Sequence, residues 1–243
     1  MTMTLLTTEL KVLFRKKVYL IFSILLPLFF YLIFTSILDL PKAQQQVFNK
    51  EYMYSMVVFS LLNFCMMSFP LDMIEERANG WYKRLMVTPM SISRYYGVKV
   101  VRTMIQFLLS IVIIFVVAHF SKDVTMSIAE WMLSGILLWI GASLFLTFGL
   151  VIAQFDDTQK ASSIANMICI LLAIAGGLWF PTTTFHDWMQ QVSKWMPTYH
   201  LKAIAYDLSK GSGINVQSFS IIFIYSIFAL IIALWINHRK DVS

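Results

Sequence analysis

The sequence contains few charged residues: 13% of its 243 residues are Asp, Glu, Lys or Arg, whereas 58% are hydrophobic. A water-soluble domain carries about a quarter charged residues. Together with a mean hydropathy of +0.72, this composition excludes a soluble core and indicates a polytopic membrane protein. Cysteine is also scarce. Cys65 and Cys169 both lie in apolar stretches, which excludes a disulfide framework and a CxxC pair.

Motifs for nucleotide or metal chemistry are absent. The chain has no GxxxxGK[ST] sequence to hold ATP phosphates and no HExxH sequence, so we expect no catalytic residue, cofactor or metal. His186, Asp187 and His200 form a conceivable metal site, but polar residues on surface helices are the favoured interpretation. Ser68 and Ser143 lie in apolar stretches without a nearby base, so no protease triad or dyad is indicated.

Six apolar stretches are long enough to cross a bilayer, which takes about 20 residues at about 1.5 Å of rise each. The predicted spans are 18–38, 52–74, 98–120, 131–153, 161–180 and 216–236. No small-residue cleavage site follows the first stretch, so we expect it to remain as an uncleaved span. Without an internal repeat, residues 1–243 are predicted to form one all-α transmembrane domain.

The positive charges predict how the chain is oriented. With the N-terminus in the cytoplasm, Lys and Arg are about twice as frequent in the inner segments as in the outer ones, as the positive-inside rule requires. Both termini are therefore expected in the cytoplasm, as parts of a multi-pass protein of the cell membrane. The net charge of +6 is explained by this topology, and we expect no nucleic-acid partner.

Two segments outside the spans have a predicted structure. Residues 1–17 carry Met3, Leu6, Leu10 and Leu13 near one helical face, which predicts an amphipathic helix in the cytoplasmic interface, in contact with membrane lipids. The alternative is a basic leader that only sets topology. Residues 181–215 are expected to form two short extracellular helices, about 184–195 and 198–210, separated at Pro197.

The end of the fifth span contains features of a broken helix. Gly176 and Gly177 lie just before Pro181, and small residues at membrane depth permit a local break or a close approach between helices. We expect the fifth span to end in a broken or re-entrant element that packs back into the outer leaflet.

Ionisable residues gather near the inner end of the second span. Asp72, Glu75 and Glu76 lie there, and Arg102 begins the third span. Arg102 has two possible roles, which the sequence leaves open: pairing with these acids, or reaching the lipid headgroups. Because a proton- or ion-coupled carrier uses acids near mid-membrane, this placement weighs against such a carrier without excluding it.

Two stretches of the sequence resemble the ABC-2 type permeases of ABC transporters. The first runs from Glu76-Arg77-Ala78-Asn79-Gly80 through Leu85-Met86-Val87-Thr88-Pro89. The second is Gly176-Gly177-Leu178-Trp179-Phe180-Pro181, followed by Trp188 and Pro197-Thr198-Tyr199. The six spans, the amphipathic N-terminal helix and the short C-terminal tail also fit, so the resemblance covers nearly the whole chain.

The resemblance implies a non-catalytic membrane subunit, dimerised with an identical or different permease chain. It would be driven by a separate ATPase that binds ATP and Mg. The first inner loop, 75–97, would contain a coupling helix that docks on this ATPase, with Gly80 permitting the turn and Leu85 and Met86 as apolar anchors. The implied coupling residues are Glu76, Arg77, Gly80, Lys83, Arg84, Leu85, Thr88 and Pro89. Trp81-Tyr82-Lys83, Ala78-Asn79 and His186 depart from the usual family pattern. The alternative is a basic loop that only obeys the positive-inside rule.

The resemblance also implies export through the dimer interface, between spans one, two and five. The candidate path residues are Phe59, Phe64, Met66, Met67, Met167 and Trp179; the candidate structural residues are Gly176, Gly177, Pro181 and Pro197. A path rich in aromatic residues and Met fits an amphiphilic cargo such as a drug, antibiotic, lipid-like molecule or peptide. The alternatives are ordinary packing side chains at these positions and, for the whole chain, a carrier or channel acting without an ATPase, or a membrane sensor.

Overall fold

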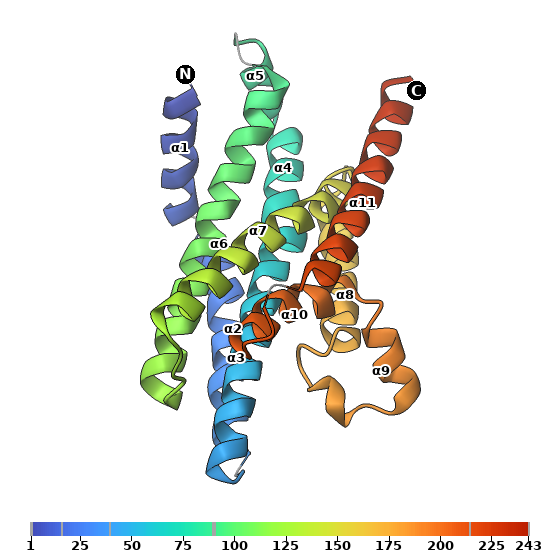
Figure 1. The fold of residues 1–243 in the computed structure, drawn as a ribbon. Coiled ribbons are helices and arrows are strands. Elements are labelled where there is room, and N and C mark those ends of the chain that lie inside the picture. Colours follow the sequence, from blue (N-terminus) through green and yellow to red (C-terminus); the bar gives the residue numbers. More distant parts are fainter. Residues whose placement is uncertain (1, 16, 39, 89–90, 214, 243) are drawn as a thin grey trace.

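The structure is a computed structural model that describes residues 2–15, 17–38, 40–88, 91–213 and 215–242 (Figure 1). Within these ranges the chain forms helices and no strands. The elements are α1 (Thr2–Arg15), α2 (Lys17–Ile37), α3 (Lys42–Asn63), the π-helical turn η1 (Phe64–Ser68), α4 (Phe69–Ala78), α5 (Trp81–Met86), α6 (Ile92–Lys122), α7 (Ile128–Ile152), α8 (Thr158–Ala175), the 3-10 turn η2 (Thr182–Thr184), α9 (Asp187–Ser193), α10 (Pro197–Ser209) and α11 (Val216–Val242).

Six helical stretches are long and apolar enough to cross a membrane, as predicted. The second is longer than expected, because α3, η1 and α4 form one helix of 37 residues, Lys42–Ala78. At about 1.5 Å per residue this helix measures about 55 Å, more than the apolar thickness of a bilayer. Its polar first turns are fixed to α2 by Gln45, whose side-chain nitrogen donates to Thr35 O at 3.1 Å.

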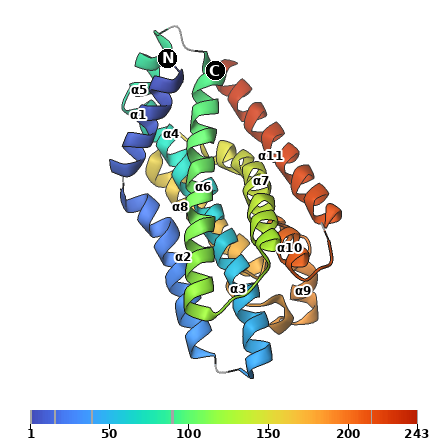
Figure 2. The same cartoon turned by 60° about the vertical axis from the view of Figure 1, so that its left-hand side comes forward.

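This long helix forms the centre of the bundle. In its apolar part 83% of the residues are buried, compared with 22% in each of α2, α8 and α11. Figure 2 shows α3 running between the surrounding helices. The π-helical turn lies where α7 approaches most closely: a Cβ atom at Gly149 would overlap the backbone carbonyl of Cys65. Glycine at position 149 is therefore what allows α7 to pack directly on this turn.

The N-terminal helix packs lengthwise against the first turns of α6 (Figures 1 and 2). Its buried face differs in part from the predicted one. Leu13 is buried as predicted and Leu6 and Leu10 are half-buried, but Met3 is exposed, and Leu5 and Glu9 are buried instead. The spacing of four residues places Leu5, Glu9 and Leu13 on one helical face. The contact with α6, rather than hydrophobicity alone, therefore decides which face is covered. Its location in the membrane interface stays a prediction.

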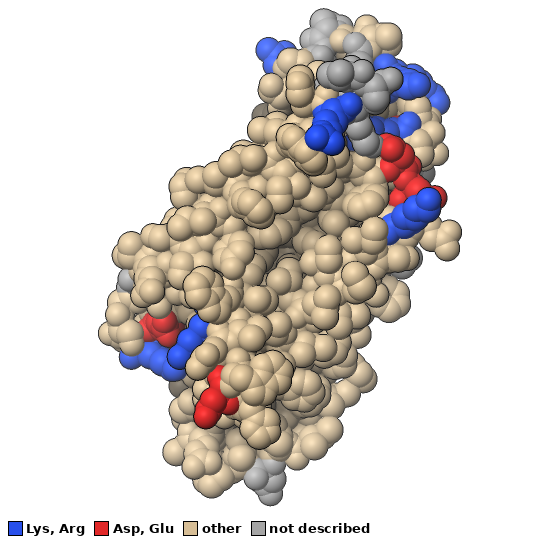
Figure 3. All heavy atoms as spheres, turned by 90° about the vertical axis from the view of Figure 1, so that its right-hand side faces the viewer, with Lys and Arg blue, Asp and Glu red and all other residues tan. Residues whose placement is uncertain are grey.

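Both termini lie at the same end of the bundle as α5, an end that we call the α5 end (Figure 1). This arrangement agrees with an even number of spans. Figure 3 shows charged side chains gathered toward the two ends of one face, with an uncharged band between them. The band fits a membrane-spanning region. That the α5 end faces the cytoplasm stays a prediction.

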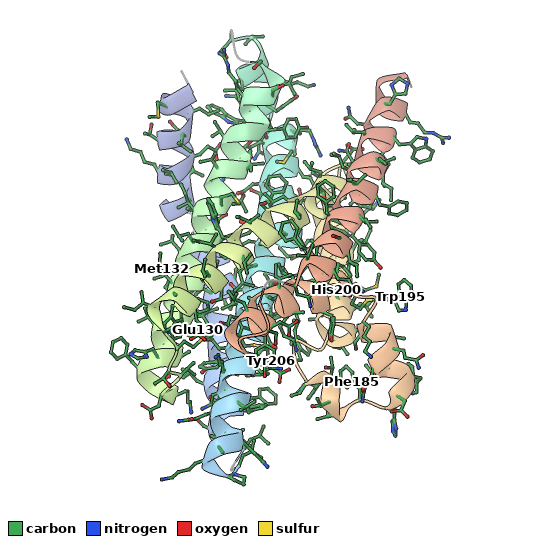
Figure 4. All side chains as sticks on the ribbon, in the orientation of Figure 1. Glu130, Met132, Phe185, Trp195, His200 and Tyr206 are labelled. Atoms are coloured by element: carbon green, nitrogen blue, oxygen red, sulfur yellow. The ribbon has the colours of Figure 1, made fainter. Side chains whose placement is uncertain are left out.

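The segment after the fifth span is broken, as predicted. α8 ends at Ala175, before the predicted Phe180, because the chain turns at Gly177, which has a φ of +68°. Pro181 precedes η2, and Pro197 is the first residue of α10. α10 is buried more deeply than an interfacial helix: Figure 4 shows His200 and Tyr206 on α10 in the middle of the bundle, with Phe185 and Trp195 toward its edge.

Candidate coupling site

The turn between α4 and α5 depends on Gly80. Its φ of +69° lies in the left-handed region, which glycine adopts without strain. α5 ends six residues later, where both the backbone nitrogen and the hydroxyl of Thr88 donate to Leu85 O, at 3.1 and 2.6 Å. Pro89, which was expected to end this helix, lies outside the described residues.

The side chains of α5 divide into exposed and buried groups. Lys83 and Arg84 are exposed, as is Trp81 at 41%, whereas Leu85 is 9% exposed and packs into the core. Leu85 therefore differs from the expected surface anchor. The exposed apolar groups next to these cations are Trp81 and Val87, which sequence reasoning did not select.

The next two expected coupling residues, Glu76 and Arg77, bond to neighbouring helices within this chain. Arg77 Nη2 donates to Phe155 O at 2.9 Å and also to Ala153 O, joining α4 to the segment between α7 and α8. Glu76 accepts a 2.7 Å hydrogen bond from the Tyr95 hydroxyl. Arg77 thus connects α4 to the segment after α7, and Glu76 connects α4 to α6.

Glu76 is part of a buried ionic network, defined as Glu9, Asp72, Glu76, Lys99 and Arg102. Glu9 Oε1 lies 2.7 Å from Lys99 Nζ, and Glu9 Oε2 lies 2.8 Å from Arg102 Nη1. Lys99 also pairs with Glu76, and Arg102 Nη2 lies 2.7 Å from Asp72 Oδ2. The side chains of Lys99 and Arg102 are only 2% and 4% exposed. Of the two roles left open for Arg102, pairing is the one observed.

Sequence reasoning missed Glu9, Lys99 and Tyr95, although two signals were present. Glu9 is the only acidic residue before position 39, in a segment that is otherwise basic. Lys99 and Arg102 are three positions apart on α6, so they share a helical face. A lone acid in the N-terminal segment and two cations on one face of α6 could have indicated a pairing between α1 and α6.

The network joins three helices that are far apart in the sequence: α1, α4 and α6. Removing one partner of a buried ion pair costs about 3–5 kcal/mol, because the other charge is left without compensation. α5 contacts this region too, through the ring of Tyr82, which lies edge-on to the ring of Tyr95 with centroids 5.2 Å apart. A displacement of α5 would therefore act directly on α6.

The candidate path residues do not form one group. Phe59 and Phe30 both contact Trp179, with ring centroids 5.7 and 5.8 Å away. Phe64 instead faces α6, where its ring centroid lies 6.4 Å from that of Phe107. Met66 is buried, Met67 is half-buried and Met167 is exposed on α8. Phe30, Phe59 and Trp179 therefore form the aromatic cluster between α2, α3 and the turn after α8.

A second buried ion pair, which sequence reasoning missed, holds α10. Lys202 Nζ lies 3.2 Å from Glu51 Oε1 on α3 and donates to Gly177 O at 3.3 Å. The Thr198 hydroxyl donates to Leu172 O at 2.8 Å, at a point where a Cβ atom on Gly176 would overlap Thr198. Gly176 and Gly177 thus allow α10 to pack against the end of α8.

The histidines show no metal-binding arrangement among the described residues, where no group of three or more His, Cys, Asp or Glu could hold an ion. Both ring nitrogens of His200 have protein partners: Nδ1 lies 3.0 Å from Ser218 Oγ and Nε2 lies 2.8 Å from Lys194 O. These bonds give His200 a structural role in holding α10 against α11.

Six candidate spans, a turn-and-helix segment at one end and an ionic network next to it define a polytopic helical membrane protein. The family model for ABC-2 type transporters matches residues 2–207, so the chain belongs to the ABC-2 type transporter family. It is also similar to a Bacillus subtilis (strain 168) protein named "Putative transport permease YvfS", with 29% identity over 233 residues, 96% of this chain and 95% of that one. Family membership makes the chain a membrane subunit of an ABC transporter and implies an ABC ATPase as its partner.

Proposed function

We propose that this chain is the permease subunit of an ATP-driven exporter and that α5 docks on the ATPase subunit. The observation that carries the proposal is the position of α5. Trp81, Lys83 and Arg84 are exposed on this helix, whereas its Tyr82 contacts Tyr95, which donates to Glu76 of the ionic network. Trp and Arg are enriched among the residues that carry most of the binding energy in protein interfaces.

The proposed mechanism passes motion from the ATPase to the membrane helices. ATP and Mg bind to the ATPase, whose closure displaces α5. Tyr82 pushes on Tyr95, and Tyr95 is bonded to Glu76. Because the ionic network joins α1, α4 and α6 by short, buried bonds, these three helices move as a unit rather than sliding past each other.

We place the dimer interface and the cargo path on the face formed by α2 and α8. Phe22 and Phe29 on α2 and Met167 and Leu171 on α8 are exposed apolar residues, which in a membrane contact either lipid or a second permease chain. The aromatic cluster lies behind this face. Trp179 Nε1 is buried without a hydrogen-bond partner among the described residues, so it is available to a polar group of an amphiphilic cargo.

The test is co-expression with the cognate ABC ATPase, followed by co-purification and ATP hydrolysis in nanodiscs. We expect the double substitution Lys83→Glu and Arg84→Glu to lower affinity for the ATPase about tenfold or more. Lys42→Glu, an exposed charge reversal at the other end of α3, is the matched control and should have no effect. Transport by the chain alone in liposomes, or unchanged coupling in the double variant, would contradict the proposal and favour a carrier or channel.

A further inference from the structure

A cleft of about 570 Å³ opens at the α5 end of the bundle. It lies between α4, α6, α7 and α11, and Tyr82 of α5 also lines it. The cleft adjoins the ionic network through Tyr95, which lines it and donates to Glu76, and is separate from the aromatic cluster. Leu230 and Leu234 on its α11 wall are exposed apolar side chains of a membrane-spanning helix, which is the side from which a lipid would enter.

The lining of the cleft is mostly polar toward the α5 end and apolar deeper in the bundle. On α11, Asn237 lies at the end of the bundle and Leu230 lies two turns deeper, about 10 Å away at about 1.5 Å per residue. Gln154, in the turn after α7, is near the end and Leu150 of α7 is deeper; on α4, Arg77 is near the end and Phe69 is deeper. α6 follows the same order, with Tyr96 before Val100, although Ile92 also lines the outer end. The cleft thus has the polarity of a lipid, headgroup outward and acyl chain inward.

The charge at the outer end is positive. Arg77 lines the cleft, and none of the described lining residues is acidic. Basic pockets between membrane helices bind the headgroups of anionic lipids.

We propose that this cleft binds an anionic glycerophospholipid from the membrane leaflet on the α5 side. The phosphate would lie at the outer end, with Arg77 as the cation and the hydroxyls of Tyr82 and Tyr96 as donors, and one acyl chain would lie along Leu150, Leu230 and Leu234. A lipid in this position contacts α11 on one side and the base of α5 on the other. It therefore links the last span to the coupling segment.

The test is native mass spectrometry of the full chain, purified from nanodiscs that contain equal amounts of phosphatidylglycerol and phosphatidylcholine. We expect phosphatidylglycerol to be retained about fivefold or more over phosphatidylcholine. Leu234→Trp, which places a bulkier side chain where the acyl chain would lie, should reduce the retention of phosphatidylglycerol. Ile231→Trp is the matched control, because Ile231 is on the same helix and similarly exposed, 58% against 61% for Leu234, but does not line the cleft.

Several outcomes would overturn the proposal. Equal retention of both lipids would show that the outer end does not select an anion, and equal behaviour of Leu234→Trp and Ile231→Trp would show that lipid binds elsewhere. If added cargo, but not phosphatidylglycerol, is lost from Leu234→Trp, the cleft is a cargo site instead. If Leu234→Trp fails to fold, Leu230→Trp at the same cleft, together with Asn237→Leu at its outer end, gives the same comparison.

Discussion

Glu9 and Arg102 are 93 positions apart in the sequence, yet Glu9 Oε2 lies 2.8 Å from Arg102 Nη1. Both side chains are buried, and Glu9 also accepts a bond from Lys99. One carboxylate on the N-terminal helix therefore compensates two cations of α6. The amphipathic helix is attached to the bundle by a specific charge interaction as well as by its apolar face.

Replacing this carboxylate should destabilise the protein. Glu9→Gln removes the negative charge and leaves Lys99 and Arg102 buried with fewer partners, at a cost of up to about 3–5 kcal/mol. The check is thermal unfolding in detergent, in which we expect a clear fall of the midpoint. Lys11→Gln, an exposed charge on the same helix, should change it little. Equal midpoints for the two variants would mean that the network does not contribute to stability.

The contact between α7 and the π-helical turn should tolerate no side chain at position 149. Gly149→Ala places a methyl group against the carbonyl of Cys65, and we expect a loss of about 1–3 kcal/mol from overpacking. Gly97→Ala is the control: it has no atom within 4 Å of the added Cβ and has helical geometry, so it should stabilise by about 0.4–1 kcal/mol. The measurement is the thermal unfolding midpoint of each variant. If both substitutions lowered it, or both raised it, the prediction would be contradicted.

The ion pair between α3 and α10 should respond unequally to its two single substitutions. Glu51→Gln leaves Lys202, whose side chain is 4% exposed, without a counter-charge. Lys202→Met leaves Glu51, whose side chain is 20% exposed and still reached by water. We therefore expect Glu51→Gln to destabilise more, and the double variant to be more stable than Glu51→Gln alone. Additive effects in a double-mutant cycle would exclude an interaction between the two groups.

His200 should make stability fall in mild acid. Burial lowers the pKa of His200 below its ordinary 6.5, and the hydrogen bond to Lys194 only partly opposes this. As the pH falls below about 6.5, this histidine becomes protonated in the unfolded chain but stays neutral in the folded chain. The folded state therefore loses stability as the pH falls below about 6.5. Unfolding midpoints measured between about pH 8 and about pH 5.5 should fall further for the wild type than for His200→Gln. Parallel curves would exclude His200 as the cause.

Trp81 is expected to be a main contributor to ATPase binding. Trp81→Ala should weaken affinity about tenfold or more, since exposed tryptophans at interface centres carry much of the binding energy. Trp188→Ala removes an exposed tryptophan from α9, away from the α5 end, and should leave affinity unchanged. Binding measured with both permease variants in nanodiscs decides this point, and equal loss would indicate a non-specific effect on folding.

Local features of the structure followed from the sequence because their causes are local. The length of each apolar stretch gave the six spans. Gly177 predicted the break after the fifth span, and Pro197 predicted the boundary between the two short helices beyond it. Both predictions were possible because the backbone geometry at glycine and proline depends on the residue itself. The predicted end of the fifth span was too late by a few residues, since apolar residues continue past the turn at Gly176.

The sequence by itself determined that this protein spans a membrane six times, that both termini share one side and that a charged segment follows the second span. Only the tertiary structure decided which charged residues face inward. Lys99 and Arg102 became part of a buried network, whereas Lys83 and Arg84 stayed exposed, although all four are basic residues within 20 positions of one another. The difference arises because the rotation of each helix, and the neighbour it packs on, depend on contacts between segments far apart in the chain.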